Sequence, residues 1–115
     1  DLVELARRAR LAGVECLVIP GGESTTIGKL ATAYGLVEPV RERVAAGMPV
    51  FGTCAGMIVL DRERLGLFDV AVERNAFGRQ VASFEADVDL EGEPEPVRGV
   101  FIRAPRIVDA GPAVG

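Results

Sequence analysis

The sequence predicts an α/β fold in which helices cover a parallel sheet. In the first half of the chain, short apolar runs typical of buried strands alternate with segments of helical periodicity. The 115 residues are enough for one domain with its own core. With 49% apolar and 26% charged residues, the composition is that of a folded globular protein. We therefore interpret residues 1–115 as a single domain.

A helix and a strand begin this pattern. Asp1 is a candidate N-cap, and apolar residues recur at helical spacing as far as about Arg10. Gly13 is expected to end this helix. The apolar run over residues 16–19 then has the length and the flanking residues of a buried strand.

Two more helices and a second strand follow. The polar residues 23–26 predict the loop and cap of a helix that continues to about Tyr34. The next helix is expected over residues 38–47, because proline is tolerated in the first turn and a glycine ends the segment. Residues 49–53 predict a strand that leads directly into an apolar helix over residues 55–60.

The second half of the chain alternates as strands do. Residues 67–72, 84–90 and 97–102 are candidate strands, and an acidic turn cluster separates the last two. The chain starts on a helix, where such a fold normally starts on a central strand, and finishes on a segment rich in glycine and proline. We therefore expect the domain to be incomplete at both ends.

Composition narrows the classes of partner and cofactor. The net charge of −4 leaves no basic face, so we expect no nucleic-acid partner. No apolar run approaches the ~20 residues of a membrane span and no signal segment is recognisable, so we expect no membrane association. Two cysteines and no cysteine–histidine spacing favour a cytoplasmic protein without a metal or other cofactor. Histidine is absent, so these residues alone cannot supply an imidazole base.

Residues 52–56, Gly-Thr-Cys-Ala-Gly, carry the strongest catalytic signal. They have the glycine-x-nucleophile-x-glycine pattern of a nucleophile elbow, with cysteine in place of serine. Cys54 is then presented at a helix N-terminus, which favours the thiolate, and the Ala55 N–H is placed to donate to an oxyanion. A buried apolar cysteine is the alternative, but the elbow spacing favours a nucleophile. Cys16 lies inside an apolar run and is expected to be buried.

A glycine pair at the end of the first predicted strand is a candidate binding loop. Open α/β sheets place their ligands at such strand ends, and Gly21 and Gly22 permit the backbone angles of an anion-binding nest. A tight turn with a helix cap explains the same residues equally well. A phosphate-binding P-loop is excluded, because Glu23 stands where its first glycine belongs and Leu30 where its serine or threonine belongs.

Two further segments combine polar and apolar side chains. Residues 73–80 surround a phenylalanine and a glycine with charged and amide groups but fit no general motif. Arg103 follows an apolar strand, where an arginine either clamps a carboxylate or ties down a loop. Taken alone, both segments favour a structural interpretation. Asp87 and Asp89 are interpreted as exposed strand positions and not as a metal site.

Together these segments resemble one protein family. The matching motifs are Pro-Gly-Gly-Glu-Ser-Thr-Thr at 20–26, Phe-Gly-Thr-Cys-Ala-Gly at 51–56, Glu-Arg-Asn-Ala-Phe-Gly-Arg-Gln at 73–80 with Ser-Phe-Glu at 83–85, and Val-Phe-Ile-Arg-Ala-Pro at 100–105. They resemble the glutaminase subunits of pyridoxal 5′-phosphate synthase, a family of class I (triad) glutamine amidotransferases. The elbow alone would indicate only a triad amidotransferase, and the first and third motifs narrow the resemblance.

The resemblance implies a fold and a chemistry. The fold is the three-layer αβα, flavodoxin-like domain of class I glutamine amidotransferases. Cys54 would attack the side-chain amide of L-glutamine to give a γ-glutamyl thioester and ammonia, and water would then release glutamate. The resemblance assigns backbone donors of Gly22 and Ala55 to the oxyanion hole. It assigns these residues to glutamine binding: Gly22, Glu23, Ser24, Arg74, Ile102 and Arg103.

The resemblance also implies a partner. In the family, the ammonia passes to a (β/α)8-barrel synthase subunit, which joins it to ribose 5-phosphate and glyceraldehyde 3-phosphate. Two hypotheses from other classes remain open. The first is a redox thiol protein of similar fold, in which Cys54 reacts with oxidants. The second is a catalytically incomplete binding module that still docks on the synthase.

The chain departs from the family pattern at three places. The family's first strand and its Leu-Gln-Gly loop have no match here. The segment between Leu60 and Leu65 is shorter than in the family. The family's His-Pro-Glu segment, which supplies the base and its orienting carboxylate, would follow residue 115. We therefore expect these 115 residues by themselves not to hydrolyse glutamine.

Overall fold

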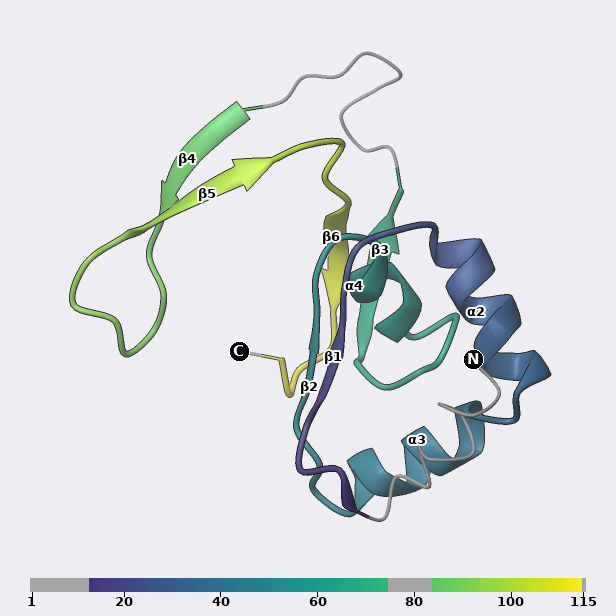
Figure 1. The fold of residues 1–115 in the computed structure, drawn as a ribbon. Coiled ribbons are helices and arrows are strands. Elements are labelled where there is room, and N and C mark those ends of the chain that lie inside the picture. Colours follow the sequence, from purple (N-terminus) through teal and green to yellow (C-terminus); the bar gives the residue numbers. More distant parts are fainter. Residues whose placement is uncertain (1–12, 75–83, 115) are drawn as a thin grey trace.

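The computed structural model describes residues 13–74 and 84–114 of the chain. The expected first helix and most of the polar segment 73–80 lie outside these residues. The described elements follow in chain order (Figure 1): β1 (Leu17–Ile19), α2 (Ser24–Ala33), α3 (Val37–Ala45), β2 (Val50–Gly52), α4 (Ala55–Leu60), β3 (Val70–Glu73), β4 (Phe84–Val88), β5 (Val97–Phe101) and β6 (Arg106–Ala110).

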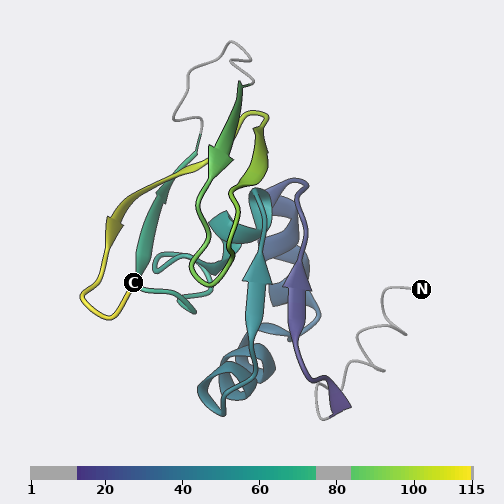
Figure 2. The same ribbon diagram turned by 90° about the vertical axis from the view of Figure 1, so that its left-hand side faces the viewer.

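The strands β1 and β2 form a parallel pair, as the alternation of strands and helices predicts. Leu17 lies opposite Val50, and Ile19 lies opposite Gly52. The helices α2 and α3 make the connection between the two strands, and α4 follows β2 after two residues. Because the strands are parallel, their carboxyl ends lie at the same edge of the sheet (Figure 2).

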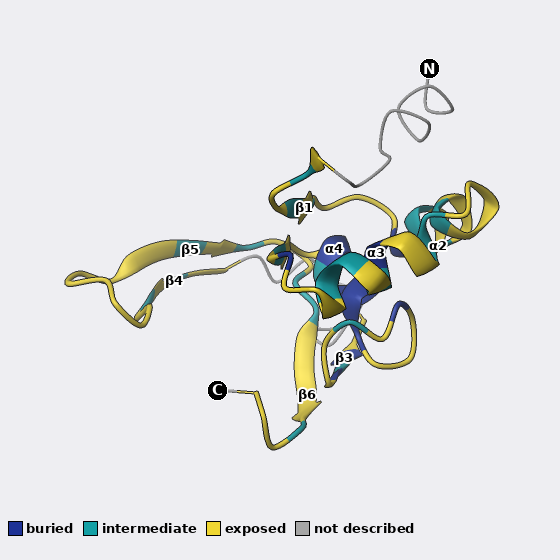
Figure 3. Ribbon diagram, turned by 90° about the horizontal axis from the view of Figure 1, so that it is seen from below, coloured by how far each residue is buried: buried dark blue, intermediate teal, exposed yellow. Residues whose placement is uncertain are grey.

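The core lies between α4 and the elements that surround it. Val59 and Leu60 are each 1% exposed and pack in a cluster with Leu65, to which partly buried residues of β1, α2 and β2 are added. Ile58, on the other side of α4, packs with Val70 and Val72 of β3. The helix α4 is therefore buried over most of its surface (Figure 3), as its uninterrupted apolar sequence predicts.

The expectation that residues 16–19 form a buried strand is wrong. Val18 is 59% exposed and Phe51, its neighbour on β2, is 63% exposed. The described helices lie on one side of the two strands (Figures 2 and 3), so they cover only the alternate side chains. The described residues thus supply one of the two helical layers of the expected αβα arrangement.

The second half of the chain forms two antiparallel pairs. The strands β4 and β5 make a hairpin, in which Phe84 stacks on Phe101 with 4.8 Å between ring centroids. The strand β3 pairs with β6, with an irregular register between Ala71 and Val72. The strand β6 was not among the predicted strands, although the β-branched pair Ile107 and Val108 was a signal for it.

An ionic turn connects α4 to β3. Asp61 is 1% exposed and accepts hydrogen bonds from the N–H groups of Glu63 and Arg64, and it forms an ion pair with the Arg64 side chain. Arg62 forms ion pairs with Asp69 at 2.8 Å and with Asp109 of β6 at 2.7 Å. These contacts fix the end of α4 against the β3–β6 pair.

Candidate active site

The carboxyl ends of β1 and β2 bring two of the predicted motifs together. The N–H of Thr53 donates to the carbonyl oxygen of Ile19 at 3.1 Å, which continues the sheet contact past the last strand residues. A Cβ atom placed on Gly21 would lie 3.5 Å from the Cβ of Cys54. The glycine loop and the elbow cysteine are therefore neighbours, at the edge where open parallel sheets bind their ligands.

Cys54 has the backbone conformation of a nucleophile elbow. Its φ is 50° and its ψ is −110°, and it is the N-cap residue of α4. This conformation costs a non-glycine residue about 1–3 kcal/mol and is found most often at functional sites. The turn is tight because α4 approaches β2 closely: a Cβ on Gly52 would lie 2.7 Å from the carbonyl carbon of Gly56. Both elbow glycines are therefore required by contact.

Both cysteines are exposed in the described structure. For Cys54, exposure beside the glycine loop is the arrangement that a nucleophile requires. For Cys16, the expectation of burial is wrong. Cys16 precedes β1 and lies outside the strand, where α4 does not cover it.

The predicted oxyanion donors are the Gly22 N–H in the glycine loop and the Ala55 N–H directly after Cys54. Among the described residues, neither the Gly22 N–H nor the Ala55 N–H donates a hydrogen bond. The Ala55 N–H belongs to the first turn of α4, where N–H groups lack an acceptor within the helix. These two donors are therefore available to an external oxygen atom, as the predicted oxyanion hole requires.

Glu23 is the N-cap of α2, and its side chain accepts hydrogen bonds from the first turn of that helix. Its carboxylate accepts hydrogen bonds from the N–H of Thr25 at 3.2 Å and from the N–H of Thr26 at 2.8 Å. The Thr26 hydroxyl donates to it at 2.8 Å. The Thr26 hydroxyl, followed by the N–H groups of Thr26 and Thr25, lowers the pKa of Glu23 from 4.5 to about 2.

Arg74 is brought to Glu23 from the far end of β3. Its Nη2 lies 3.3 Å from Glu23 Oε1, and its Nη1 donates to the Thr25 hydroxyl at 3.3 Å. The two charged residues are 51 positions apart in the sequence. The structure thus brings Glu23 and Arg74, two residues of the predicted glutamine site, into contact. Thr25 and Thr26 take part in the same contacts, although the sequence placed them only in a motif. Hydroxyl side chains directly after an acidic cap residue were the available signal.

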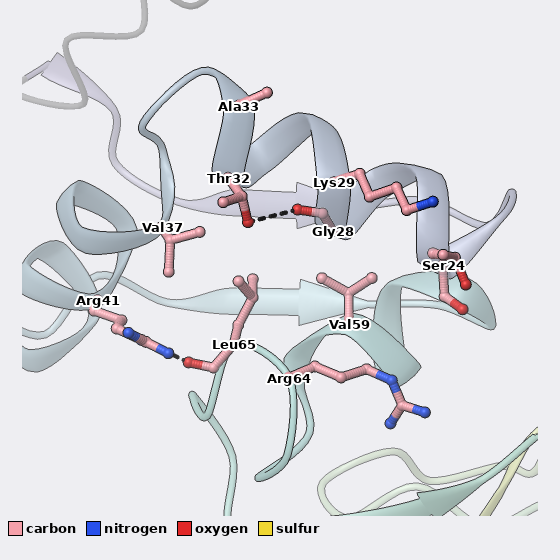
Figure 4. Close-up of a pocket in the computed structure, with 11 residues that line it drawn as sticks. Ser24, Gly28, Lys29, Thr32, Ala33, Val37, Arg41, Val59, Arg64 and Leu65 are labelled. Atoms are coloured by element: carbon pink, nitrogen blue, oxygen red, sulfur yellow. Dashed lines mark hydrogen bonds between the residues drawn. The ribbon is translucent and has the colours of Figure 1, made fainter.

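Ser24 behaves differently from its neighbour Glu23. It is 5% exposed, and its side chain lines a groove of about 670 Å³ between α2, α3 and the turn after α4 (Figure 4). Neither Cys54 nor Arg74 lines this groove. Thr25, whose hydroxyl accepts a hydrogen bond from Arg74, also lines the groove, so the groove that Ser24 lines begins beside the Arg74 contact.

Ile102 and Arg103 lie in the turn between β5 and β6, on the side of the molecule to which the carboxyl ends of β1 and β2 point (Figures 1 and 2). Ile102 is 59% exposed, and Arg103 has a φ of 47°. Among the described residues, Cys54 and Arg103 are the only non-glycine residues with positive φ. No described hydrogen bond or ion pair joins Arg103 to the other predicted site residues.

Residues 13–74 and 84–114 show neither a candidate metal site nor a helix that could span a membrane. No described group of histidine, cysteine, aspartate and glutamate side chains could hold a metal ion. No described helix has both the length and the apolar composition needed to cross a membrane.

The pKa of Glu23 predicts a pH dependence of stability. Because the folded-state pKa lies below the usual value, ionised Glu23 contributes stability that is complete above about pH 4.5 and is lost as the pH falls toward 2. We expect the free energy of unfolding of Glu23→Gln to fall less steeply over this interval than that of the unsubstituted protein. Urea unfolding at several pH values measures the difference. Glu91→Gln, in the β4–β5 turn, is the control, and parallel curves for Glu23→Gln and the unsubstituted protein would contradict the prediction.

Comparisons with known proteins agree with this architecture. The model of the SNO glutamine amidotransferase family matches residues 3–114. "Pyridoxal 5′-phosphate synthase subunit PdxT" of Acidothermus cellulolyticus is 56% identical, over 99% of this chain and 60% of that protein. The protein of the same name from Pelotomaculum thermopropionicum is 57% identical, over 99% of this chain and 62% of that protein. The chain thus spans about three fifths of the length of these curated relatives.

A solved structure supports the fold directly. It is described as "Crystal structure of glutamine amidotransferase", matches with a TM-score of 0.80 at 51% identity, and covers 87% of this chain and 57% of that chain. The predicted α/β amidotransferase-like fold is therefore confirmed. The alignment with the Acidothermus protein spans 124 positions against 115 residues here, so that relative has residues without a counterpart in this chain. From the family match, the sequence identities and the fold together, we conclude that the chain belongs to the SNO glutamine amidotransferase family.

Proposed function

We propose that the protein carrying this chain hydrolyses L-glutamine to glutamate and ammonia, as the glutaminase subunit of a pyridoxal 5′-phosphate synthase. The single observation that carries the proposal is the exposed Cys54, held in a strained elbow conformation beside the Gly21–Gly22 loop. Relatives named as subunits of that synthase, at more than half identical residues, support the choice of reaction.

The reaction follows from the groups around Cys54. The thiolate Sγ attacks the side-chain amide carbon of glutamine, and the carbonyl oxygen becomes an oxyanion that accepts from the N–H groups of Gly22 and Ala55. The C–N bond then breaks, the nitrogen takes up a proton and leaves as ammonia, and a γ-glutamyl thioester remains. Water attacks the thioester, which releases glutamate and restores the thiol.

Proton transfer in both steps needs an acid–base group, and this chain contains no histidine to act as one. The family resemblance assigns this task to a histidine oriented by a glutamate, and no residue of the chain matches either of them. The chain therefore contributes the nucleophile, the oxyanion donors and part of the binding site.

The α-carboxylate of glutamine is a suitable ligand for the Arg74 guanidinium. A guanidinium binds a carboxylate through two parallel hydrogen bonds, and the Arg74 side chain is 43% exposed beside the start of α2. We assign glutamine binding to the residues that the family resemblance gives: Gly22, Glu23, Ser24, Arg74, Ile102 and Arg103. We further propose that the ammonia passes to a (β/α)8-barrel synthase subunit and that the protein acts in the cytoplasm.

A glutamine-analogue diazo-ketone tests the function. In the full gene product, assayed with its synthase subunit, we expect the reagent to alkylate Cys54 and L-glutamine to prevent it. Cys16, which is also exposed, serves as the internal control, since glutamine should not change its alkylation. Peptide mass spectrometry quantifies both sites.

Alkylation, together with an assay of ammonia release from glutamine, separates the competing hypotheses. A redox thiol protein would be alkylated at Cys54 without protection by glutamine. A binding module that has lost catalysis would associate with the synthase but release no ammonia from glutamine. Either result would overturn the proposed function.

A further inference from the structure

We propose that Thr26 is a positioning residue of the glutamine site: its hydroxyl fixes the carboxylate of Glu23, and Glu23 in turn holds the guanidinium of Arg74. The inference rests on the proposed function, because it takes Arg74 as a ligand of glutamine. Thr26 donates twice to Glu23 Oε2, from its N–H and from its hydroxyl, both at 2.8 Å. Holding Oε2 in this way orients the other oxygen, Oε1, toward Arg74.

The Glu23 carboxylate has its acceptor positions filled. A carboxylate offers about four such positions. Oε1 accepts from the Thr25 N–H and from Arg74 Nη2, and Oε2 accepts the two bonds from Thr26. We therefore infer that the Glu23 carboxylate acts on glutamine through Arg74, so that direct contact of Glu23 with the substrate is left to its backbone.

The residue type at the cap agrees with this role. Serine, threonine, aspartate and asparagine are the favoured N-cap residues, and glutamate is not among them. The additional methylene of Glu23 lets one carboxylate cap α2 and also reach Arg74, the residue that directly follows β3. Capping of α2 alone does not account for a glutamate at this position.

Arg74 retains N–H donors for a ligand while Glu23 and Thr25 hold its side chain. A guanidinium has five N–H donors. Among the described residues Arg74 uses one nitrogen on Glu23 and another on the Thr25 hydroxyl, both at 3.3 Å. The remaining donors are sufficient for a two-bond contact with the α-carboxylate of glutamine. Removing the Thr26 hydroxyl should therefore weaken the binding of glutamine more than it slows the reaction at Cys54.

Three substitutions in the full gene product test the proposal, with initial rates measured in the presence of the synthase subunit. Thr26→Val removes the hydroxyl and keeps the shape of the side chain, and we expect it to raise KM for glutamine about tenfold while kcat changes less than threefold. Thr26→Ser restores the hydroxyl, and KM should return to within threefold of the original value. Thr32→Val is the matched control, because the Thr32 hydroxyl donates only to Gly28 O, within the same helix.

The outcomes are distinguishable. An unchanged KM in Thr26→Val, or an equal change in Thr32→Val, overturns the positioning role and leaves the proposed function intact. A Thr26→Ser protein that fails to recover also overturns it. Absence of glutamine hydrolysis in the unsubstituted protein overturns the proposed function itself, and with it this role. A raised KM in Thr26→Val, with a KM near the original value in both Thr26→Ser and Thr32→Val, supports the proposal.

Discussion

Replacement of Cys54 by alanine is expected to lower the rate of glutamine hydrolysis by about four orders of magnitude or more. Without Sγ no thioester forms, and only the oxyanion donors and the binding residues remain to assist attack by water. The backbone should tolerate the change, because alanine is smaller and the Cys54 side chain is exposed. Initial rates of glutamate formation by the full gene product with its synthase subunit measure the effect.

Cys16→Ser is the matched control for this substitution. Cys16 is the other exposed thiol of the described structure and lies before β1, away from the elbow turn. We expect the rate of glutamine hydrolysis by Cys16→Ser to stay within twofold of that of the unsubstituted protein. A Cys54→Ala protein that keeps more than about 1% of the activity would refute the assignment of Cys54 as nucleophile.

Gly56→Ala is expected to destabilise the protein by about 3 kcal/mol, near the upper end of the usual cost of overpacking a core. A Cβ atom on Gly56 would overlap the carbonyl oxygen of Ile19 and would lie 2.8 Å from its carbonyl carbon. The clash is with backbone, which cannot rotate away, so α4 must shift relative to β1. Urea unfolding of the full gene product, followed by circular dichroism, measures the loss.

Gly28→Ala is the matched control, with an effect of opposite sign. Gly28 lies inside α2, and a Cβ atom there would meet nothing within 4 Å. Because alanine loses less backbone freedom than glycine on folding, we expect a gain of about 0.4–1 kcal/mol. Equal stability of Gly56→Ala and the unsubstituted protein would show that α4 does not approach β1 as closely as described.

Much of the local structure was predictable. Polar cap residues place α2, a first-turn proline and a terminal glycine place α3, and an apolar run places α4, each within a few residues of its observed bounds. The strand β6 was missed because it lacks strict alternation of apolar and polar residues, and its pairing partner β3 is 33 residues away in the closest register. Pairing over such a distance depends on the whole fold, which local patterns do not contain.

The site was predictable in part. The elbow pattern identified Cys54, and the family resemblance supplied Glu23 and Arg74, but neither indicated that the two charged residues touch. Burial was harder to predict than identity. Cys16 and Val18 belong to an apolar run, yet both are exposed. Cys16 precedes the strand, and Val18 lies on the face of the strand pair that the helices do not cover.

The sequence by itself determined the order of helices and strands from β1 to β5, the family, and the cysteine at the turn between β2 and α4. These features follow from residue type and spacing along the chain. Only the tertiary structure decided that Thr26, Glu23 and Arg74 form one chain of contacts, because a parallel sheet and an antiparallel pair must pack before residues 51 positions apart can meet. Local sequence sets backbone preferences, whereas contacts between distant segments depend on how those segments pack.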